Sequence, residues 1–441
     1  MRMPTLLLPA LLLALAACGD GPPAPAAAAD PGAAYEVHPW PLPSTTGSAQ
    51  PDLLVTDDGR LMLSWISSPP GRRHALRFVS MAENGRWQSS PRTIVVGEKL
   101  AANWADVPHL ASTGGTLWVH WMQQSGEGHA TDIALTRSTD AGFNWSAPVL
   151  VNDDGTEAEH GFVSMWPAAG GKLGVAWLDG RASAADAAQP HGGGTALRAA
   201  LFDTNLQRSN EQVVDELACD CCQTSVAMTD RGPLLVYRDR GTDEIRDIAA
   251  TRFDGSTWSA PRPVHADGWK INACPVNGPS VAADGNDAVV AWYTAADDVP
   301  RVQVARSTDA GDTFGEPVVL DQGEAVQGRV AVALDERQAW ILWLREDASG
   351  QALWLSRRSP DLSKEYQRLR VGALQGRGKG TGFPRIALRG NAAHLVWTDV
   401  VDGAPRLSGA IIAPAERASR ADERDAQATA AARRTPGSPP A

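Results

Sequence analysis

Four cysteines of this 441-residue chain lie in two short segments, and they carry its most specific chemistry. Cys219, Cys221 and Cys222 are close neighbours in one segment, and Cys274 lies in the other, directly before Pro275. Closely spaced thiols can form disulfides, hold a soft metal ion or take part in redox reactions. Their spacing matches no common zinc pattern. The elements that position the two segments therefore decide which of these reactions is open to them.

Those elements belong to a repeat. A hydrophobic run that ends in an aromatic residue recurs along the chain at intervals of roughly 50 to 60 residues, a period typical of blades or coils. The seven runs end at Trp65, Trp121, Trp177, Tyr237, Trp292, Trp343 and Trp397. The repeats that contain them begin near residues 50, 103, 160, 222, 275, 326 and 382.

Each repeat has the pattern of four short strands. In one copy the runs 279–282, 288–292, 301–307 and 317–320 are rich in β-branched residues and are separated by Gly, Asp and Asn turns. Four such strands form one antiparallel propeller blade. We therefore predict an all-β fold, a β-propeller of four-stranded blades with seven blades; six blades, with one weak repeat as an insertion, is the alternative.

Ring closure follows from the two ends of the repeat region. The seventh repeat stops after its third strand, at residues 407–412, and an unassigned strand precedes the first repeat at residues 35–42. If this N-terminal strand pairs into the last blade, no sheet edge stays exposed. We expect residues 35–413 to form the propeller.

A second motif lies in the turn between third and fourth strands. Residues 138–145 and 307–314 share Ser-Thr-Asp-Ala-Gly and an aromatic three residues after the Gly, and 254–258 and 84–87 are weaker copies. The Asp can accept hydrogen bonds from the turn backbone, and the Gly can adopt positive φ. The motif resembles the Asp box of the sialidase, or BNR-repeat, superfamily, over nearly the whole chain after its leader. The resemblance implies a propeller, but Asp boxes are structural turns and imply no activity.

The first residues read as a processing signal. Arg2 precedes an apolar stretch from Leu6 to Leu15, and Leu15-Ala16-Ala17-Cys18 resembles a bacterial lipobox. We expect residues 1–18 to be the lipoprotein signal, Cys18 to be lipidated, residues 19–34 to form a flexible tether and residues 414–441 a disordered tail. A plain secretory signal with a chance cysteine is the alternative. Because Gly19 follows Cys18, family analogy favours a lipid anchor in the outer membrane of the cell envelope.

Propeller topology gathers certain segments on one rim, namely those before first strands and after second strands. Loops on a rigid ring are where function concentrates. Charged and aromatic residues in these segments include Trp104, Asp106, His160, Asp179, Arg181, Arg238, Asp239, Arg240, Asp297, Asp298, Arg329, Arg345, Glu346, Asp347, Arg385 and Asp399. Solvated loop charge is the alternative for any single one, but the ring makes several converge on the channel mouth.

The cysteines belong to this rim, because the repeat offset aligns Cys219 with Cys274 at the entrances of adjacent blades. Export to an oxidising compartment makes two disulfides the first interpretation. A copper or zinc site from three or four thiolates, with His160 or Asp220 nearby, is the second. A redox or substrate-facing role is the third. No other cofactor is predicted.

The family resemblance also implies a test for sialidase chemistry. Sialidases grip a carboxylate with three arginines, use a Tyr nucleophile paired with a Glu, and employ an Asp as acid and base. Here Tyr293 is the candidate nucleophile, with Asp179 or Asp239 as acid and base; Tyr237 holds the core position of its repeat. The candidate ligand-binding arginines are Arg181, Arg238, Arg240, Arg329 and Arg385. The early Phe/Tyr-Arg-Ile-Pro motif of sialidases is missing, and no Glu can be paired with Tyr293 from sequence.

A net charge of −11 argues against nucleic acid as a partner. The sequence thus favours an exported, lipid-anchored propeller that binds a small molecule or glycan at a polar, cysteine-framed channel mouth. A sialidase-type glycoside hydrolase and a periplasmic copper- or zinc-handling protein are the alternatives.

Overall fold

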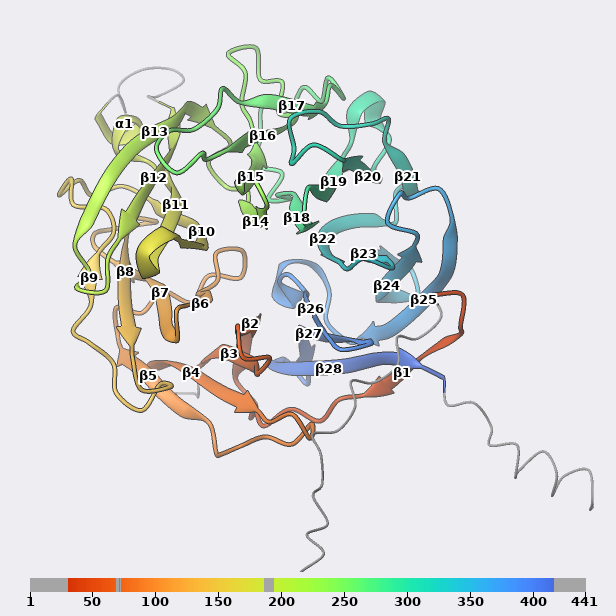
Figure 1. The fold of residues 1–441 in the computed structure, drawn as a ribbon, viewed down its shortest axis with the longest axis horizontal. Helices are drawn as coiled ribbons and strands as arrows, with labels where there is room; N and C mark the ends of the chain where they lie inside the picture. Colours follow the sequence, from red (N-terminus) through yellow and green to blue (C-terminus); the bar gives the residue numbers. More distant parts are fainter. Residues whose placement is uncertain (1–30, 69–70, 72, 186–193, 416–441) are drawn as a thin grey trace, which may run out of the picture.

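The computed structural model describes residues 31–68, 71, 73–185 and 194–415, and these form a closed ring of seven four-stranded antiparallel sheets (Figure 1). The prediction of a seven-bladed all-β propeller is confirmed, and the six-blade alternative is wrong. The predicted leader, the lipidation site Cys18, and most of the tether and tail lie outside the described residues.

In the first six blades the strands follow chain order from the innermost to the outermost position; in the seventh, the N-terminal strand of the chain takes the outermost position. The first blade contains β2 (Ser48–Val55), β3 (Leu61–Ser67), β4 (His74–Met81) and β5 (Arg92–Gly97), and the second contains β6 (Leu110–Thr113), β7 (Thr116–Gln124), β8 (Thr131–Ser138) and β9 (Val149–Leu150). The third blade contains β10 (His160–Ala168), β11 (Lys172–Asp179), β12 (Thr195–Phe202) and β13 (Arg208–Ala218), and the fourth contains β14 (Ser225–Thr229), β15 (Gly232–Arg238), β16 (Ile248–Arg252) and β17 (Arg262–His265). The fifth blade contains β18 (Ser280–Asp284), β19 (Asp287–Thr294), β20 (Arg301–Ser307) and β21 (Val318–Gln322). The sixth contains β22 (Val326–Leu334), β23 (Ala339–Asp347), β24 (Gly350–Arg358) and β25 (Glu365–Leu374). The seventh contains β26 (Arg385–Arg389), β27 (Ala392–Val401), β28 (Ala404–Pro414) and β1 (Tyr35–Pro39).

Helical structure in the described residues is confined to short turns. These are α1 (Arg181–Ala185), η1 (Ala169–Gly171), η2 (Ala296–Asp298) and η3 (Gly378–Thr381). Within the same residues, no helix has the length and apolar character needed to cross a bilayer.

The second strand of each blade is buried on both faces, because it lies inside its sheet and between two neighbouring blades. All seven residues of β3 are buried, for example. A strand covered on both sides is hydrophobic along its whole length rather than at alternate positions. This is the physical reason that the runs ending at Trp65 and its equivalents were the clearest sequence signal.

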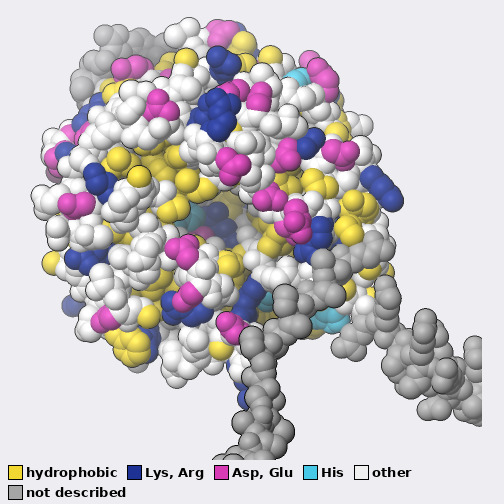
Figure 2. Space-filling model, viewed as in Figure 1, with side chains coloured by type: hydrophobic (Ala, Val, Ile, Leu, Met, Phe, Trp, Pro, Cys, Tyr) yellow, Lys and Arg dark blue, Asp and Glu magenta, His cyan; other side chains and the backbone are white. Residues whose placement is uncertain are grey.

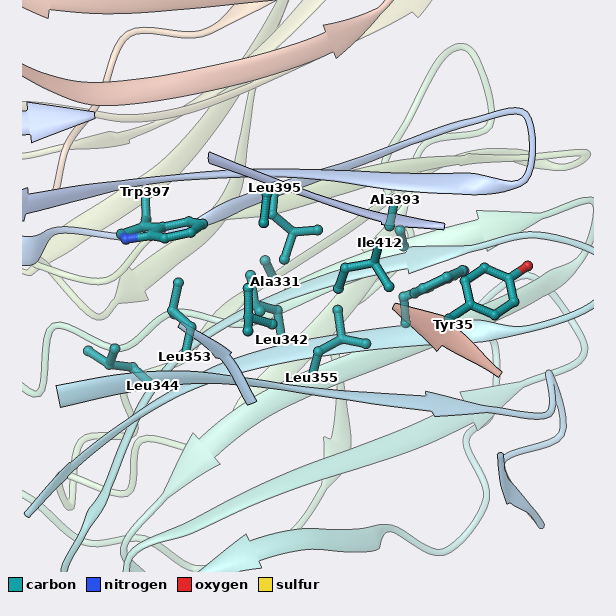
Figure 3. Close-up of a cluster of buried hydrophobic side chains, with 14 of the residues drawn as sticks. Tyr35, Ala331, Leu342, Leu344, Leu353, Leu355, Ala393, Leu395, Trp397 and Ile412 are labelled. Carbon is teal, nitrogen blue, oxygen red and sulfur yellow. The ribbon is translucent and has the colours of Figure 1, made fainter. Parts of the chain in front are cut away.

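The N-terminal strand closes the ring as predicted. β1 pairs antiparallel with β28, with Tyr35 opposite Pro414 and Pro39 opposite Ala410. The Tyr35 ring packs edge-on against Trp340 of the neighbouring blade, with 5.4 Å between centroids. Figure 3 shows Tyr35 within the hydrophobic cluster that joins the sixth blade to the closing blade. The N-terminal strand therefore contributes both its hydrogen bonds and a large buried ring to closure.

The Asp-box turns have the predicted geometry. Asp309 Oδ1 accepts the Thr313 N–H at 2.9 Å and the Ser307 hydroxyl at 2.7 Å. Gly311 has a φ of +86°, and a Cβ at this position would overlap the Leu234 side chain of the preceding blade. The turn thus needs glycine both for its conformation and for the close approach of two blades.

Candidate functional site

A cavity of about 580 Å³ opens at the predicted rim, where several blade entrances meet. Its walls come from segments before first strands and from the ends of second strands, as the propeller topology predicts. The lining residues include Gln50, Asn103, Trp104, Asp106, Gln124, His129, Glu159, Phe162, Cys221, Cys274, Val276 and Lys379. The ring is hollowed at its centre, and basic and histidine side chains lie deep in that hollow (Figure 2).

Trp104 forms a partly exposed aromatic wall of this cavity. Its indole stacks on Phe383 with 5.8 Å between centroids and a 16° angle between the rings. The Arg329 guanidinium lies 5.1 Å from the centre of the Trp104 ring, and it donates to Thr381 Oγ1 at 2.9 Å and to the Gly382 carbonyl oxygen at 3.0 Å. Arg329, a predicted ligand-binding residue, is therefore buried and supports Trp104 from behind. Burial lowers its pKa to about 10.

Two carboxyl groups stand beside the Trp104 wall. Asp106 is buried and accepts the backbone N–H of Phe162; Gly161 leaves room for its carboxylate, which a Cβ would overlap. Burial, opposed by the Phe162 hydrogen bond and reinforced by the negative charge of Glu159, raises the pKa of Asp106 to about 8. Burial also raises the pKa of Glu159, against the opposing charge of His129. Asp106 is therefore a neutral acid at pH 7 and can donate a hydrogen bond.

A buried polar network links blades one, two and seven along the channel. His109 Nδ1 donates to Asp52 Oδ1 at 3.1 Å, and Arg385 Nη2 lies 3.4 Å from His109 Nε2. Burial favours the neutral acid at Asp52, but the charges of His109 and Arg385 outweigh it and hold the Asp52 pKa below its usual value. Burial lowers the pKa of His120 far below the usual value, so its neutral Nε2 accepts the His109 backbone N–H at 3.0 Å. The predicted ligand residue Arg385 is thus tied to Asp52 and His109.

The predicted acid Asp179 is fully buried in the third blade. Its carboxylate accepts two hydrogen bonds from Arg181, both at 2.7 Å, and one from Trp177 Nε1 at 2.9 Å. His160 Nε2 lies 3.1 Å from Asp154 and 3.8 Å from Asp179. Asp179 and Arg181 therefore form an ion pair with each other, and neither lines the cavity.

Tyr293, Asp239 and Arg240 lie at the ends of the second strands of blades four and five. Tyr293 is half-buried, and its ring packs edge-on against Trp269 at 5.6 Å. Burial raises the pKa of Asp239 to about 6, and Arg240 pairs with Glu244 at 2.6 Å. Among the described residues, no hydrogen bond or ion pair joins Tyr293 to Asp179 or Asp239. The roles predicted for these three residues stay predictions.

Arg238 is buried where blades four and five meet, and its acceptors among the described residues are backbone oxygens. Its guanidinium donates to the carbonyl oxygens of Arg246 at 2.6 Å, Tyr293 at 2.7 Å and Asn277 at 2.8 and 3.0 Å. These bonds tie the end of β15 to the next blade.

The two cysteine segments lie side by side, in the links between blades three and four and between blades four and five. Cys219 Sγ is 2.7 Å from Cys222 Sγ and 3.8 Å from Cys221 Sγ, and Cys274 Sγ is 3.7 Å from Asp220 Oδ1. None of these four described cysteines is bonded to another. Because Cys221 and Cys274 also line the cavity, the thiols face the same opening as Trp104 and Asp106.

The sequence interpretation missed several cavity residues. Glu159 directly precedes the predicted first strand at His160, His129 follows the second strand of its repeat, and Lys379 precedes the last first strand. All three lie in a segment before a first strand or after a second strand, which is the criterion that located Trp104. Applying that rule to every blade would have found them.

Comparison with known families agrees with this architecture. The family model for the BNR repeat-like domain matches residues 59–385. This chain belongs to the BNR repeat-like domain family. The resemblance to the sialidase and BNR-repeat superfamily is therefore confirmed. A search among curated proteins found no significant match.

Solved structures similar to this BNR repeat-like protein share its fold at low sequence identity. The endosialidase of phage phi92 is 10% identical, with a TM-score of 0.50 over 87% of this chain and 70% of that chain. An α-L-arabinanase of Penicillium chrysogenum is 12% identical, with a TM-score of 0.46 over 86% and 97% of the two chains. The NanB sialidase of Streptococcus pneumoniae is 12% identical, with a TM-score of 0.46 over 85% and 70%. Likeness at this level describes the fold alone.

Proposed function

We propose that this protein binds a neutral carbohydrate in the cavity at the channel mouth. The observation that carries the proposal is the combination of Trp104 with hydrogen-bonding side chains around it. An indole fixed by Phe383 and Arg329 offers a flat apolar surface for the C–H face of a sugar ring. The cavity volume of about 580 Å³ lies within the range of small-ligand sites.

The polar groups of the cavity suit hydroxyl groups. Asn103, Gln124 and His129 can each donate or accept, and neutral Asp106 can donate where an ionised carboxylate could only accept. A neutral sugar is preferred to a sialylated one because the arginines that would grip a carboxylate have protein partners. Arg181 is paired with Asp179, and the donors of Arg238 are bonded to backbone oxygens.

Binding of uncharged oligosaccharides is expected to depend on Trp104. Calorimetric titration with arabino-, gluco- and galacto-oligosaccharides should give at least one ligand whose affinity falls by about 10-fold or more in Trp104→Ala. Phe143→Ala is the matched control, because Phe143 is 68% exposed on an Asp-box turn and should leave affinity unchanged. Failure of every neutral oligosaccharide to bind, or tighter binding of sialyllactose, would refute the proposal.

Glycoside cleavage is the second candidate function. It is favoured by Asp106, which stays protonated at neutral pH beside Glu159, since hydrolysis of a glycosidic bond needs one protonated and one ionised carboxyl. Chromatography of the oligosaccharides after the same incubations distinguishes the two functions. New reducing ends indicate cleavage, and unchanged sugars indicate binding alone.

Export and lipid attachment belong to the same proposal. They are supported by the leader and by the lipobox-like sequence that ends at Cys18. Recovery of the full-length protein in the membrane fraction, and its release by Cys18→Ser, tests this part. A soluble wild-type protein would contradict it.

A further inference from the structure

The link between blades three and four brings three thiols into one compact group. Ligand atoms of Cys219, Cys221 and Cys222 all lie within 4.8 Å of one another, with Cys219 and Cys222 buried and Cys221 half-buried. We infer that these three thiolates bind one copper(I) ion at the edge of the carbohydrate cavity. The inference rests on the sulfur geometry and is independent of whether a sugar binds.

The backbone fixes the position of the first thiol. The Cys219 N–H donates to the Arg238 carbonyl oxygen at 3.0 Å, directly after a bridge between Ala218 and Asp239. The chain then turns over Asp220 and Cys221 so that Cys222 returns toward Cys219. A rigid blade edge therefore presents the three sulfurs from a single turn. The 2.7 Å between Cys219 and Cys222 Sγ must widen by about 1 Å, through side-chain rotation, for both sulfurs to bind one ion.

Buried positive charge lies next to the sulfurs. Arg246 is 3% exposed, and its Nη1 lies 3.5 Å from Cys219 Sγ and 3.4 Å from Asp220 Oδ1. Three thiolates around one monovalent cation leave two excess negative charges. Arg246 and the neighbouring buried Arg238 can offset this excess, which a purely apolar environment could not do.

Three soft ligands favour copper(I) over zinc. Thiolates select soft ions, and copper(I) accepts three sulfurs in a plane, whereas structural zinc takes four ligands in a tetrahedron. Cys274 does not join the three-cysteine group to complete such a tetrahedron; it groups with Asp220 and with Cys221, which belongs to both groups. The Asp220 carboxylate is a hard ligand already paired with Arg246.

The site is accessible from one side. Cys221 lines the cavity, while Cys219 and Cys222 are each 1% exposed. A metal ion can thus enter through the cavity and be held by two sulfurs that solvent does not reach. Exposed Cys274 lies beside the entrance and outside the three-sulfur group.

Copper binding can be measured by competition. The full-length protein, reduced and kept anaerobic, is titrated with copper(I) in the presence of bathocuproine disulfonate. We expect one copper(I) per chain, with affinity lowered about 100-fold or more in Cys222→Ser and less than about 3-fold in Cys274→Ser. Thermal unfolding of each variant checks its fold, and X-ray absorption of the wild-type complex should give three sulfur neighbours.

The other outcomes would overturn the inference. They are failure of the reduced protein to retain copper against the chelator, equal loss in Cys222→Ser and Cys274→Ser, or displacement of copper by equimolar zinc. Because none of these readouts involves sugar, failure here is distinguishable from failure of carbohydrate binding.

Discussion

Replacing Arg238 by methionine is expected to lower the free energy of unfolding by about 4 kcal/mol. The guanidinium is 1% exposed, and it satisfies carbonyl oxygens of Arg246, Asn277 and Tyr293. Methionine fills similar space but leaves these three oxygens without their donor, and each buried unsatisfied oxygen costs on the order of 1 kcal/mol or more. Chemical denaturation followed by tryptophan fluorescence measures the difference.

The control for this prediction lies two residues further along. Arg240 pairs with Glu244 near the surface, and its side chain is 15% exposed. Arg240→Met should therefore cost no more than about 1 kcal/mol. Equal costs for the two variants would mean that the bonds of Arg238 to the next blade contribute nothing special to stability.

Replacing Asp106 by asparagine should stabilise the protein in a manner that depends on pH. Burial raises the pKa of Asp106 from 3.8 to about 8, so the folded protein holds a proton that the unfolded chain has lost. This proton uptake lowers wild-type stability progressively as pH rises from about 4 to about 8. Asparagine needs no proton and can still accept the Phe162 N–H. The variant should equal the wild type near pH 4 and exceed it by about 5 kcal/mol near pH 8.5.

Asp52 provides a control of opposite sign in the same channel. Burial raises the pKa of this carboxyl, but the charges of His109 and Arg385 prevail and hold it below its usual value. Its contribution to stability is therefore present above the unfolded pKa and is lost as pH falls through the folded pKa. Asp52→Asn should lose stability at pH 7 and approach the wild type in acid. Urea titrations across about pH 2 to 8.5 compare both variants, because the Asp52 effect is lost only below its unfolded pKa. Parallel profiles for Asp52→Asn and Asp106→Asn would contradict the assignment.

The propeller could be predicted because the strongest signals in the sequence are local, each lying within a single strand or turn. Strands such as β3 are buried on both faces, and a run such as Leu61–Ser67 is hydrophobic without interruption. The Asp boxes are equally local, since the Asp309 carboxylate accepts hydrogen bonds from Ser307 and Thr313 of its own turn. Both features can be read without knowing what lies across the ring. The equivalence of Cys219 and Cys274 followed from the repeat alone.

The state of individual side chains was not predictable in this way. Arg238 and Arg329 are of a residue type that is common in ligand sites. Their acceptors, however, are oxygens of distant segments such as Asn277 and Gly382. A backbone carbonyl has no residue type, so nothing in the sequence marks it as a partner. The same holds for Asp106, whose raised pKa arises from burial created by other blades.

The pairing of β1 with β28 also constrains the order of folding. Residues 35–39 are synthesised early, yet their partners at residues 410–414 emerge from the ribosome only after six complete blades. The entropy of closing so long a loop must be overcome before any of those hydrogen bonds form. The last sheet is therefore assembled only after synthesis has reached its final strand, and until then β1 lacks the strand with which it pairs.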